Sequence, residues 1–343
     1  MDGVTDAACR YITAKYGRPA VVFTEFTAVE GLRAGAIRLL EDFYYDESER
    51  PVVAQVFGAD PTAFYIAGVL TSALGFDGID INMGCPAKNV AQRGAGAALI
   101  RDPERAKEIY RQTVAGTKAW ADGVELRDLG VPPGLIQKID ERFAGRAMGK
   151  REELPVSIKT RIGYDVPVTE EWVSHLLELN PATLTLHGRT LKQLYTGLAD
   201  WDEIGKGAAL VRAHRDRGGR TLVLGNGDLD TVEQAHEKIL QHSLDGALIG
   251  RSSIGNPWVF AGSVATPEER IAVALEHSRY LHTLFGDMGF LRIRRHLLEY
   301  TKGFPGAKLV RMQLSSVKTI ADAERILSDP AILSAPHEPT VLP

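Results

Sequence analysis

The stretch that decides the fold is PVVAQVFGADPTAFYIAGVLTSALGFDGIDINMG, from Pro51 to Gly84. It begins with one apolar run, residues 51–58, and ends with another, residues 78–84. Between them, Asp60 suits a helix N-cap and Pro61 suits the first helical position, so a helix is predicted there. Both runs are mostly continuous rather than alternating, which is typical of parallel strands covered on both faces. The stretch therefore predicts a strand–helix–strand unit.

The same pattern continues on both sides of this unit. Seven strand candidates alternate with helix-like segments, at residues 19–26, 51–58, 78–84, 155–163, 182–188, 221–227 and 245–251. Such alternation predicts a (β/α)8 TIM barrel, with a doubly wound sheet as the alternative. The chain opens on MDGVTDAACRYI, which resembles a strand-to-helix loop without its strand. We therefore expect the first strand of the barrel to be missing from this chain and to lie upstream of Met1.

Three further segments complete the expected organisation. Residues 119–153 form a long, polar connection with a helical stretch, which we interpret as a surface insertion in a barrel domain of residues 1–264. Residues 265–328 show helical patterns without strand signals and predict a separate helical domain. The proline-rich residues 329–343 predict a flexible tail.

Composition limits the class of protein. The chain has 343 residues, of which 44% are hydrophobic and 24% charged, as in ordinary globular proteins. Cys9 and Cys85 are too few for a disulfide framework or a four-thiolate metal site, and they suit a reducing compartment. No apolar run approaches the roughly 20 residues of a membrane span, and no signal peptide is visible. We expect a cytoplasmic protein without a metal ion or membrane contact.

Polar residues follow every strand candidate. In barrels the chemistry lies beyond the carboxyl ends of the strands, so these residues predict the site. Solvated loop residues are the alternative for any one of them, but not for seven successive ends. They are Glu25, Gln55, Asn82 with Cys85, Lys159 with Arg161, His187 with Arg189, Asn226 with Asp228, and Gly250 with Arg251.

The last two strand ends carry glycine-rich loops, GNGD at residues 225–228 and IGRSSIGNPW at residues 249–258. Glycine lets backbone N–H groups approach an anion closely, and Arg251 would add a charged contact. A phosphorylated cofactor or substrate is predicted there. Lys159 and His187 follow neighbouring strands, and a buried cation would stabilise negative charge on a reduced ring or enolate. A hydrogen-bonded core histidine is the alternative for His187.

Cys85 lies between Gly84 and Pro86, in a loop and not inside a strand. This setting favours exposure at the site, although a lone cysteine is more often a small buried hydrophobe. An acid, a nucleophile, a metal ligand and a packed thiol are all conceivable at this point.

Several motifs together resemble the tRNA-dihydrouridine synthase family, over about residues 1–306. They are MDGVTD, VVAQVFG, DGIDINMGCPAKNV, IKTRIGY, LTLHGRT, VLGNGD and ALIGRSSIGNPWVF. The resemblance implies an FMN enzyme that reduces the 5,6 double bond of a uridine in tRNA, with NADPH recharging the flavin.

The resemblance also implies roles for individual residues. Asn82 and Arg161 would recognise the uracil, and Cys85 would deliver a proton. A thiol of ordinary pKa, about 8.5, is mostly protonated at neutral pH and suits a general acid. A nucleophile would need a basic partner, and a metal ligand would need companions that the composition lacks. The implied flavin contacts are Gln55, Lys159 and His187 at the ring, Asn226, Gly227, Asp228, Gly250 and Arg251 at the ribityl chain and phosphate, and Met1 as the remnant of a first-strand Pro-Met pair.

Residues 286–320 carry seven Lys and Arg against two Asp and Glu, in a chain of net charge −4. With the resemblance this predicts a tRNA-binding patch that includes Arg294 and Arg295, and a solvated helix face is the alternative. We expect a monomer. Two other functions stay open: an FMN barrel acting on a small molecule, of the dihydroorotate type, and a flavin-free RNA-binding protein on a decayed barrel.

Overall fold

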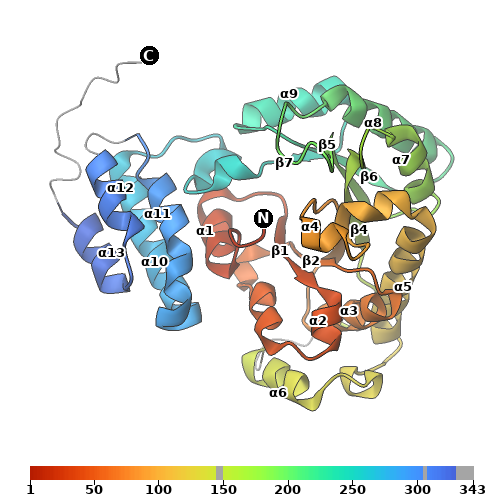
Figure 1. Cartoon of the computed structure of the whole chain (residues 1–343), viewed down its shortest axis with the longest axis horizontal. Helices are drawn as coiled ribbons and strands as arrows, with labels where there is room; N and C mark the ends of the chain where they lie inside the picture. The colour runs from red at the N-terminus through yellow and green to blue at the C-terminus, as the bar shows by residue number, and fades with distance from the viewer. Residues whose placement is uncertain (144–149, 304–306, 330–343) are drawn as a thin grey trace.

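The computed structural model describes residues 1–143, 150–303 and 307–329, and its centre is a curled parallel sheet (Figure 1). The sheet has seven strands that pair in chain order. All seven strand candidates are confirmed. They are β1 (Val22–Ala28), β2 (Val52–Phe57), β3 (Gly78–Met83), β4 (Val156–Gly163), β5 (Thr183–Thr190), β6 (Leu222–Asn226) and β7 (Gly246–Leu248).

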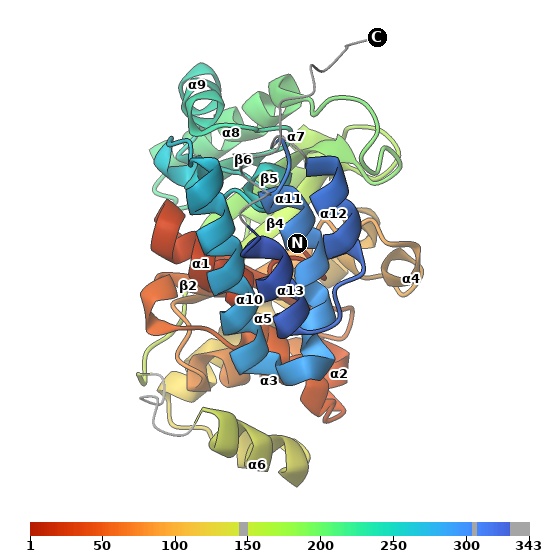
Figure 2. The same ribbon diagram turned by 90° about the vertical axis from the view of Figure 1, so that its left-hand side faces the viewer.

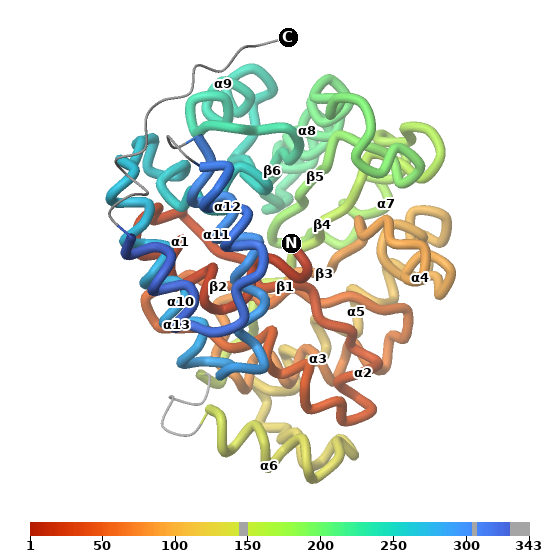
Figure 3. Tube along the Cα trace, turned by 60° about the vertical axis from the view of Figure 1, so that its left-hand side comes forward, coloured from red at the N-terminus to blue at the C-terminus, as the bar shows by residue number. Residues whose placement is uncertain are grey.

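The seven strands form a TIM-barrel-like half-barrel, and the tube in Figure 3 follows them around its curve. Among the described residues no pairing joins β1 to β7, so the barrel is open between these two strands. An additional strand upstream of Met1 stays a prediction.

Helices cover the outer face of the sheet. They are α2 (Val29–Arg33), α3 (Pro61–Ala73), α5 (Pro103–Ala121), α7 (Thr169–Leu177), α8 (Trp201–Asp216) and α9 (Val232–His242). The short α4 (Lys88–Ala91) follows the end of β3, and its Val90 clusters with Cys85. Asp60 caps α3 as predicted, because its Oδ1 accepts the backbone N–H of Thr62 at 2.9 Å. Helices α3 and α5 approach closely at Gly116, where an added Cβ would lie 2.1 Å from the Tyr65 carbonyl oxygen.

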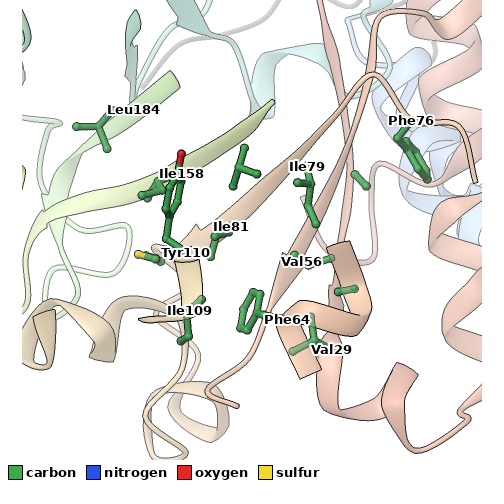
Figure 4. Packing of buried hydrophobic residues seen from close by; sticks show 14 of the residues in the cluster. Val29, Val56, Phe64, Phe76, Ile79, Ile81, Ile109, Tyr110, Ile158 and Leu184 are labelled. Carbon is green, nitrogen blue, oxygen red and sulfur yellow. The ribbon is translucent and has the colours of Figure 1, made fainter. Parts of the chain in front are cut away.

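The main apolar core lies between these helices and the outward side chains of the strands. Figure 4 shows Phe64 of α3 and Ile109 of α5 close to Ile79 and Ile81 of β3. Ile79 and Ile81 point outward, so the alternate residues Asp80 and Asn82 point to the inside of the half-barrel. The same alternation leaves a polar inner face on the neighbouring strands.

The C-terminal helices form a second group, seen side by side in Figure 2. They are α10 (Pro267–Phe290), α11 (Arg294–Tyr300), α12 (Ala307–Ser315) and α13 (Ile320–Leu327). Gly286 interrupts α10 with a φ of 60°, which glycine adopts without strain. The apolar cluster of this group includes Ala8 and Ile12 of α1 (Ala7–Gly17), so the N-terminal helix packs on this group. Arg10 of α1 forms an ion pair with Glu49, before β2, at 3.0 Å. A helical C-terminal region is confirmed, and its boundaries as a domain stay a prediction.

The long connection after α5 carries α6 (Pro133–Arg142), which confirms its predicted helix. The return to the sheet is held by Trp120, whose indole N–H donates to the carbonyl of Lys150 at 3.0 Å. The Arg151 guanidinium lies 3.6 Å from the centre of a Trp120 ring. Residues 144–149 of this predicted insertion, and residues 330–343 of the predicted tail, lie outside the described residues.

Candidate functional site

Neighbouring strands bring the predicted site residues side by side. Asn82 of β3 is the register partner of Lys159 of β4. Arg161, two residues further along β4, pairs with His187 of β5, and His187 pairs with Asn226 of β6. Side chains two residues apart share a face of a strand. These five residues therefore share the carboxyl-terminal part of the inner face.

The end of β3 is organised by the side chain of Asn82. Its Oδ1 accepts the backbone N–H groups of Gly84 at 3.0 Å and Cys85 at 2.9 Å. Its Nδ2 donates to Oε1 of Gln55 at 3.1 Å. Asn82 thus fixes the turn that carries Cys85 and joins it to β2.

Cys85 is only 7% exposed, so the expectation of an exposed thiol is wrong. Its side chain packs with Val90 and Ala95, against the rings of Phe26 and Phe57. Burial raises the pKa of the Cys85 thiol above its ordinary value, which keeps the thiol protonated. An apolar, protonated thiol can act as an acid and is a poor nucleophile at neutral pH.

Lys159 and Arg161 of β4 lie near Cys85, and His187 of β5 lies beside both of them. Burial lowers the pKa of Lys159 to about 8, with Arg161 adding to the shift and Asp80 opposing it. Burial lowers the pKa of His187 to about 2, helped by the positive charges of Lys159 and Arg161. His187 is therefore a neutral imidazole at physiological pH. Lys159 is the group of this cluster whose charge changes near neutral pH.

Arg161 holds the loop around the site in place. Its Nε donates to the carbonyl of Gly84 at 2.8 Å, and its Nη1 donates to the carbonyls of Thr190 and Leu194 at 2.9 and 3.0 Å. No hydrogen bond to Nη2 occurs within residues 1–143, 150–303 and 307–329, which leaves its two N–H groups for a ligand. The Tyr195 ring lies 6.0 Å from the guanidinium and is 65% exposed.

A second arginine, Arg189, connects β5 to the end of β6. Its Nη1 lies 3.4 Å from Nε2 of His187, which must accept because an arginine only donates. Its Nη2 donates to both carboxylate oxygens of Asp228 at 2.9 and 2.7 Å, and Arg251 donates to the same carboxylate at 2.7 Å. Asp228 is thus occupied by two arginines. This contact suits a role in positioning Arg251 better than direct contact with a phosphate.

The two glycine loops lie beside this ion pair. Gly227 has a φ of 136°, and Trp201 donates its indole N–H to the Gly227 carbonyl at 3.2 Å. An added Cβ at Gly250 would meet only the Met1 sulfur within 4 Å, at 3.7 Å. The Arg251 side chain is 61% exposed. Glycine backbone, an exposed guanidinium and the basic groups of β4 and β5 form a donor set that fits FMN, which carries a phosphate and a ring system that becomes anionic on reduction.

Met1 and Asn226 complete the predicted cofactor residues. The Met1 carbonyl accepts the backbone N–H groups of Val4 and Thr5, each at 3.1 Å, so the chain turns tightly there. Asn226 donates from Nδ2 to the carbonyl of Leu248 at 3.0 Å, which joins β6 to β7. Met1 thus lies close to Gly250 even though the whole barrel separates them in sequence.

A cavity of about 990 Å³ lies next to this site, and none of the predicted site residues lines it. It shares Val90 and Ala95 with the surroundings of Cys85. Its charged lining is mainly acidic, which disfavours a phosphate. The lining includes the acids Glu30, Asp60, Asp102, Glu104 and Glu108 and the bases Arg93 and Arg105.

The predicted tRNA patch contains half-buried and exposed cations. Arg294 is half-buried and donates from Nε to the carbonyl of Val317 at 2.7 Å, and Arg292 bonds to Glu41 at 2.6 Å. Arg295 is exposed and only 3.5 Å from the Gly3 carbonyl, so it lies where α11 meets the N-terminal loop. Lys302, Lys308 and Lys318 are exposed as well.

Sequence reasoning missed Asp80 and the role of Arg189. Asp80 is fully buried and accepts hydrogen bonds from Gln55 and Ser157. An aspartate inside an otherwise apolar strand was the signal that could have found it, because a buried charge needs partners. The signal for Arg189 was its spacing of two from His187, which places both side chains on one face.

A family model described as "Dihydrouridine synthase (Dus)" matches residues 1–120 and 144–335. The chain belongs to the dihydrouridine synthase family. A probable tRNA-dihydrouridine synthase of Staphylococcus aureus (strain COL) is 31% identical over 339 residues, covering 96% of this chain and 90% of the relative. The probable tRNA-dihydrouridine synthase 2 of Bacillus subtilis (strain 168) is 30% identical over 340 residues, covering 96% and 91%.

The gap in the dihydrouridine synthase match, residues 121–143, falls within the segment that we interpret as an insertion. A crystal structure of DHODH from Eimeria tenella in complex with ferulenol is 13% identical, with a TM-score of 0.40 over 75% of this chain and 64% of that chain. Within the described residues, no helix is long and apolar enough to cross a membrane. The same part of the chain contains no group of three or more His, Cys, Asp or Glu placed to hold a metal ion.

Proposed function

We propose that this chain reduces the 5,6 double bond of a uridine in tRNA, with FMN as its cofactor and NADPH as the reductant. The observation that carries the proposal is the contact of Asn82 with the Cys85 loop, directly beside Lys159 and Arg161. Membership of the dihydrouridine synthase family and the printed names of the relatives support it. tRNA as substrate also favours the cytoplasm, and we propose a monomer.

Two sets of residues would hold FMN. Gln55, Lys159 and His187 would contact the ring system from the inner face of β2, β4 and β5. Charged Lys159 would stabilise negative charge on the ring, whereas neutral His187 would offer a hydrogen bond without adding charge. FMN, when bound, supplies the hydride that reduces the pyrimidine, and NADPH restores it. The second set, at the ribityl chain and phosphate, comprises Met1, Asn226, Gly227, Gly250 and Arg251, with Asp228 holding Arg251.

Cys85 would protonate C5 of the uracil. Its raised pKa keeps the proton on sulfur at neutral pH, so the acid is available in nearly every molecule. The apolar packing around the thiol excludes water, which would otherwise compete as a proton source.

Asn82 and Arg161 would recognise the uracil. Arg161 has two N–H groups on Nη2 for a carbonyl oxygen of the base. Because the base is stacked in folded tRNA, it must swing out into the half-barrel. The exposed cations at the helical region, Arg295 among them, would contact phosphates.

The test is reduction of unmodified tRNA by the purified protein. Flavin absorbance of the protein as isolated, and dihydrouridine formed from tRNA with NADPH, are the expected results. A colourless protein that binds RNA would instead support the flavin-free alternative. Reduction of a free pyrimidine but not of tRNA would support the small-molecule alternative.

A further inference from the structure

We propose that Asp80 is the positioning residue that sets the direction of a hydrogen-bond relay through Gln55 and Asn82 to the Cys85 loop. The inference rests on the proposed function only for the role of the Cys85 loop in the reaction. The relay itself follows from the hydrogen-bond donors and acceptors of these side chains.

The relay joins β2 and β3, and Ser157 of β4 bonds to Asp80 from the other side. Gln55, Asp80 and Ser157 are register partners on β2, β3 and β4. Oδ2 of Asp80 accepts from Nε2 of Gln55 at 2.7 Å, and Oδ1 accepts from the Ser157 hydroxyl at 2.6 Å. The carboxyl group is fully buried, and both its oxygens have partners inside the protein.

The chemistry of the two ends permits one orientation of the amides. At one end, a carboxylate only accepts, so Gln55 must turn its NH2 group to Asp80 and its Oε1 to Asn82. At the other end, backbone N–H groups only donate, so Asn82 must turn Oδ1 to Gly84 and Cys85 and its NH2 group to Gln55. Both requirements agree at the 3.1 Å contact between Asn82 and Gln55. Each amide is thus fixed from both sides, and a reversed amide would bring like groups together.

Burial raises the pKa of Asp80, which favours the protonated form of this carboxyl group. A protonated Asp80 would keep the relay if its proton were on Oδ1, where the Ser157 hydroxyl can accept it. An asparagine at position 80 has the same option, since it can turn its NH2 group to Ser157. Asp80→Asn alone should therefore disturb the Cys85 loop only slightly.

The decisive experiment is a double-mutant cycle of Gln55→Glu and Asp80→Asn. In Gln55→Glu, two carboxyl groups face each other, and a proton shared between them keeps the link. The cycle is therefore measured from neutral to alkaline pH, because the link fails only where both groups are ionised. In the double variant, the new amide at position 80 donates to the new carboxylate at position 55. The second oxygen of that carboxylate accepts from Asn82, so the link is restored. Amide hydrogen exchange at Cys85 and alkylation of its thiol by iodoacetamide report on the loop without requiring turnover.

We expect Gln55→Glu to raise both rates about tenfold, as expected for the loss of a hydrogen bond to a charged group. Adding Asp80→Asn should bring both rates back to within about threefold of the starting protein. Ser157→Ala is the matched control, because it removes a partner of Asp80 outside the relay and should leave both rates unchanged. Circular dichroism of each variant separates a local change from unfolding.

Equal effects of Asp80→Asn in both backgrounds would overturn the proposal, and so would an equal response to Ser157→Ala. Failure of the proposed function would give a different experimental result. In that case the starting protein makes no dihydrouridine, while the cycle still shows whether Asp80 and Gln55 are coupled at the Cys85 loop.

Discussion

Asn82 Oδ1 accepts the backbone N–H of Cys85 at 2.9 Å, so the side chain at the end of β3 holds the loop that bears the thiol. The same asparagine is the register partner of Lys159. A backbone contact of this kind positions the sulfur without touching it. The thiol can therefore be removed without removing the contact that orders its loop.

Cys85→Ala should keep flavin and tRNA binding and lose dihydrouridine formation by about a hundredfold or more, the usual contribution of a general acid. Dihydrouridine measured in tRNA by mass spectrometry, beside flavin and tRNA affinities, checks this. Cys9→Ala is the matched control. Cys9 is buried in α1, where burial raises the pKa of its thiol to about 12, and it lies outside the proposed site. Turnover of Cys85→Ala at the rate of the starting protein would remove the thiol from the mechanism.

Affinity for reduced flavin should fall as the pH rises through about 8. Lys159 has a pKa lowered to about 8, so it is charged below that pH and neutral above it. The neutral amine no longer stabilises the reduced ring, which is anionic. Anaerobic titrations with reduced FMN from neutral to alkaline pH measure the effect, and Lys159→Arg should move the decline to higher pH because arginine stays charged. An unchanged pH dependence in Lys159→Arg would mean that another group titrates.

Arg295→Glu should weaken tRNA binding and lower the slope of log affinity against log salt by about 1, as for the loss of one phosphate contact. Arg294→Glu should behave differently, because Arg294 is half-buried and bonds to the Val317 carbonyl. Its main effect should be a lower melting temperature. Salt titrations of tRNA binding, with thermal unfolding of both variants, separate the two roles. A full salt slope in Arg295→Glu would place the RNA elsewhere.

Arg189→Leu should lower the free energy of unfolding by about 2 kcal/mol, as for the loss of hydrogen bonds to a charged partner. Burial alone would raise the pKa of Asp228, but the Ala199 N–H and Arg189 outweigh it and hold this pKa below its ordinary value. The stability from this pair is present above the usual aspartate pKa and is lost as the pH falls through the lowered one. Urea unfolding should therefore show a smaller difference between the two proteins in strong acid. A constant difference would point to packing alone.

The residue patterns alone predicted the strands and the end of the sheet at which the candidate site lies. Continuous apolar runs that alternate with capped helices predict parallel strands covered by helices. The residues that follow these runs were therefore predicted at the strand ends, among them Gln55, Asn82, Lys159 and His187. The basic patch was less predictable. A charge count does not distinguish Arg295, which is exposed, from Arg294, whose guanidinium donates to a carbonyl in the connection between α12 and α13.

The sequence by itself determined the order of strands and helices and the residues at the mouth of the half-barrel, because these depend on local periodicity and capping. Only the tertiary structure decided that Cys85 is buried, that Asp228 holds two arginines, and that Asp80 joins Gln55 to the inner network. These relationships depend on which side chains meet across strands. That meeting is set by the pairing register and the curl of the sheet, which no single segment encodes.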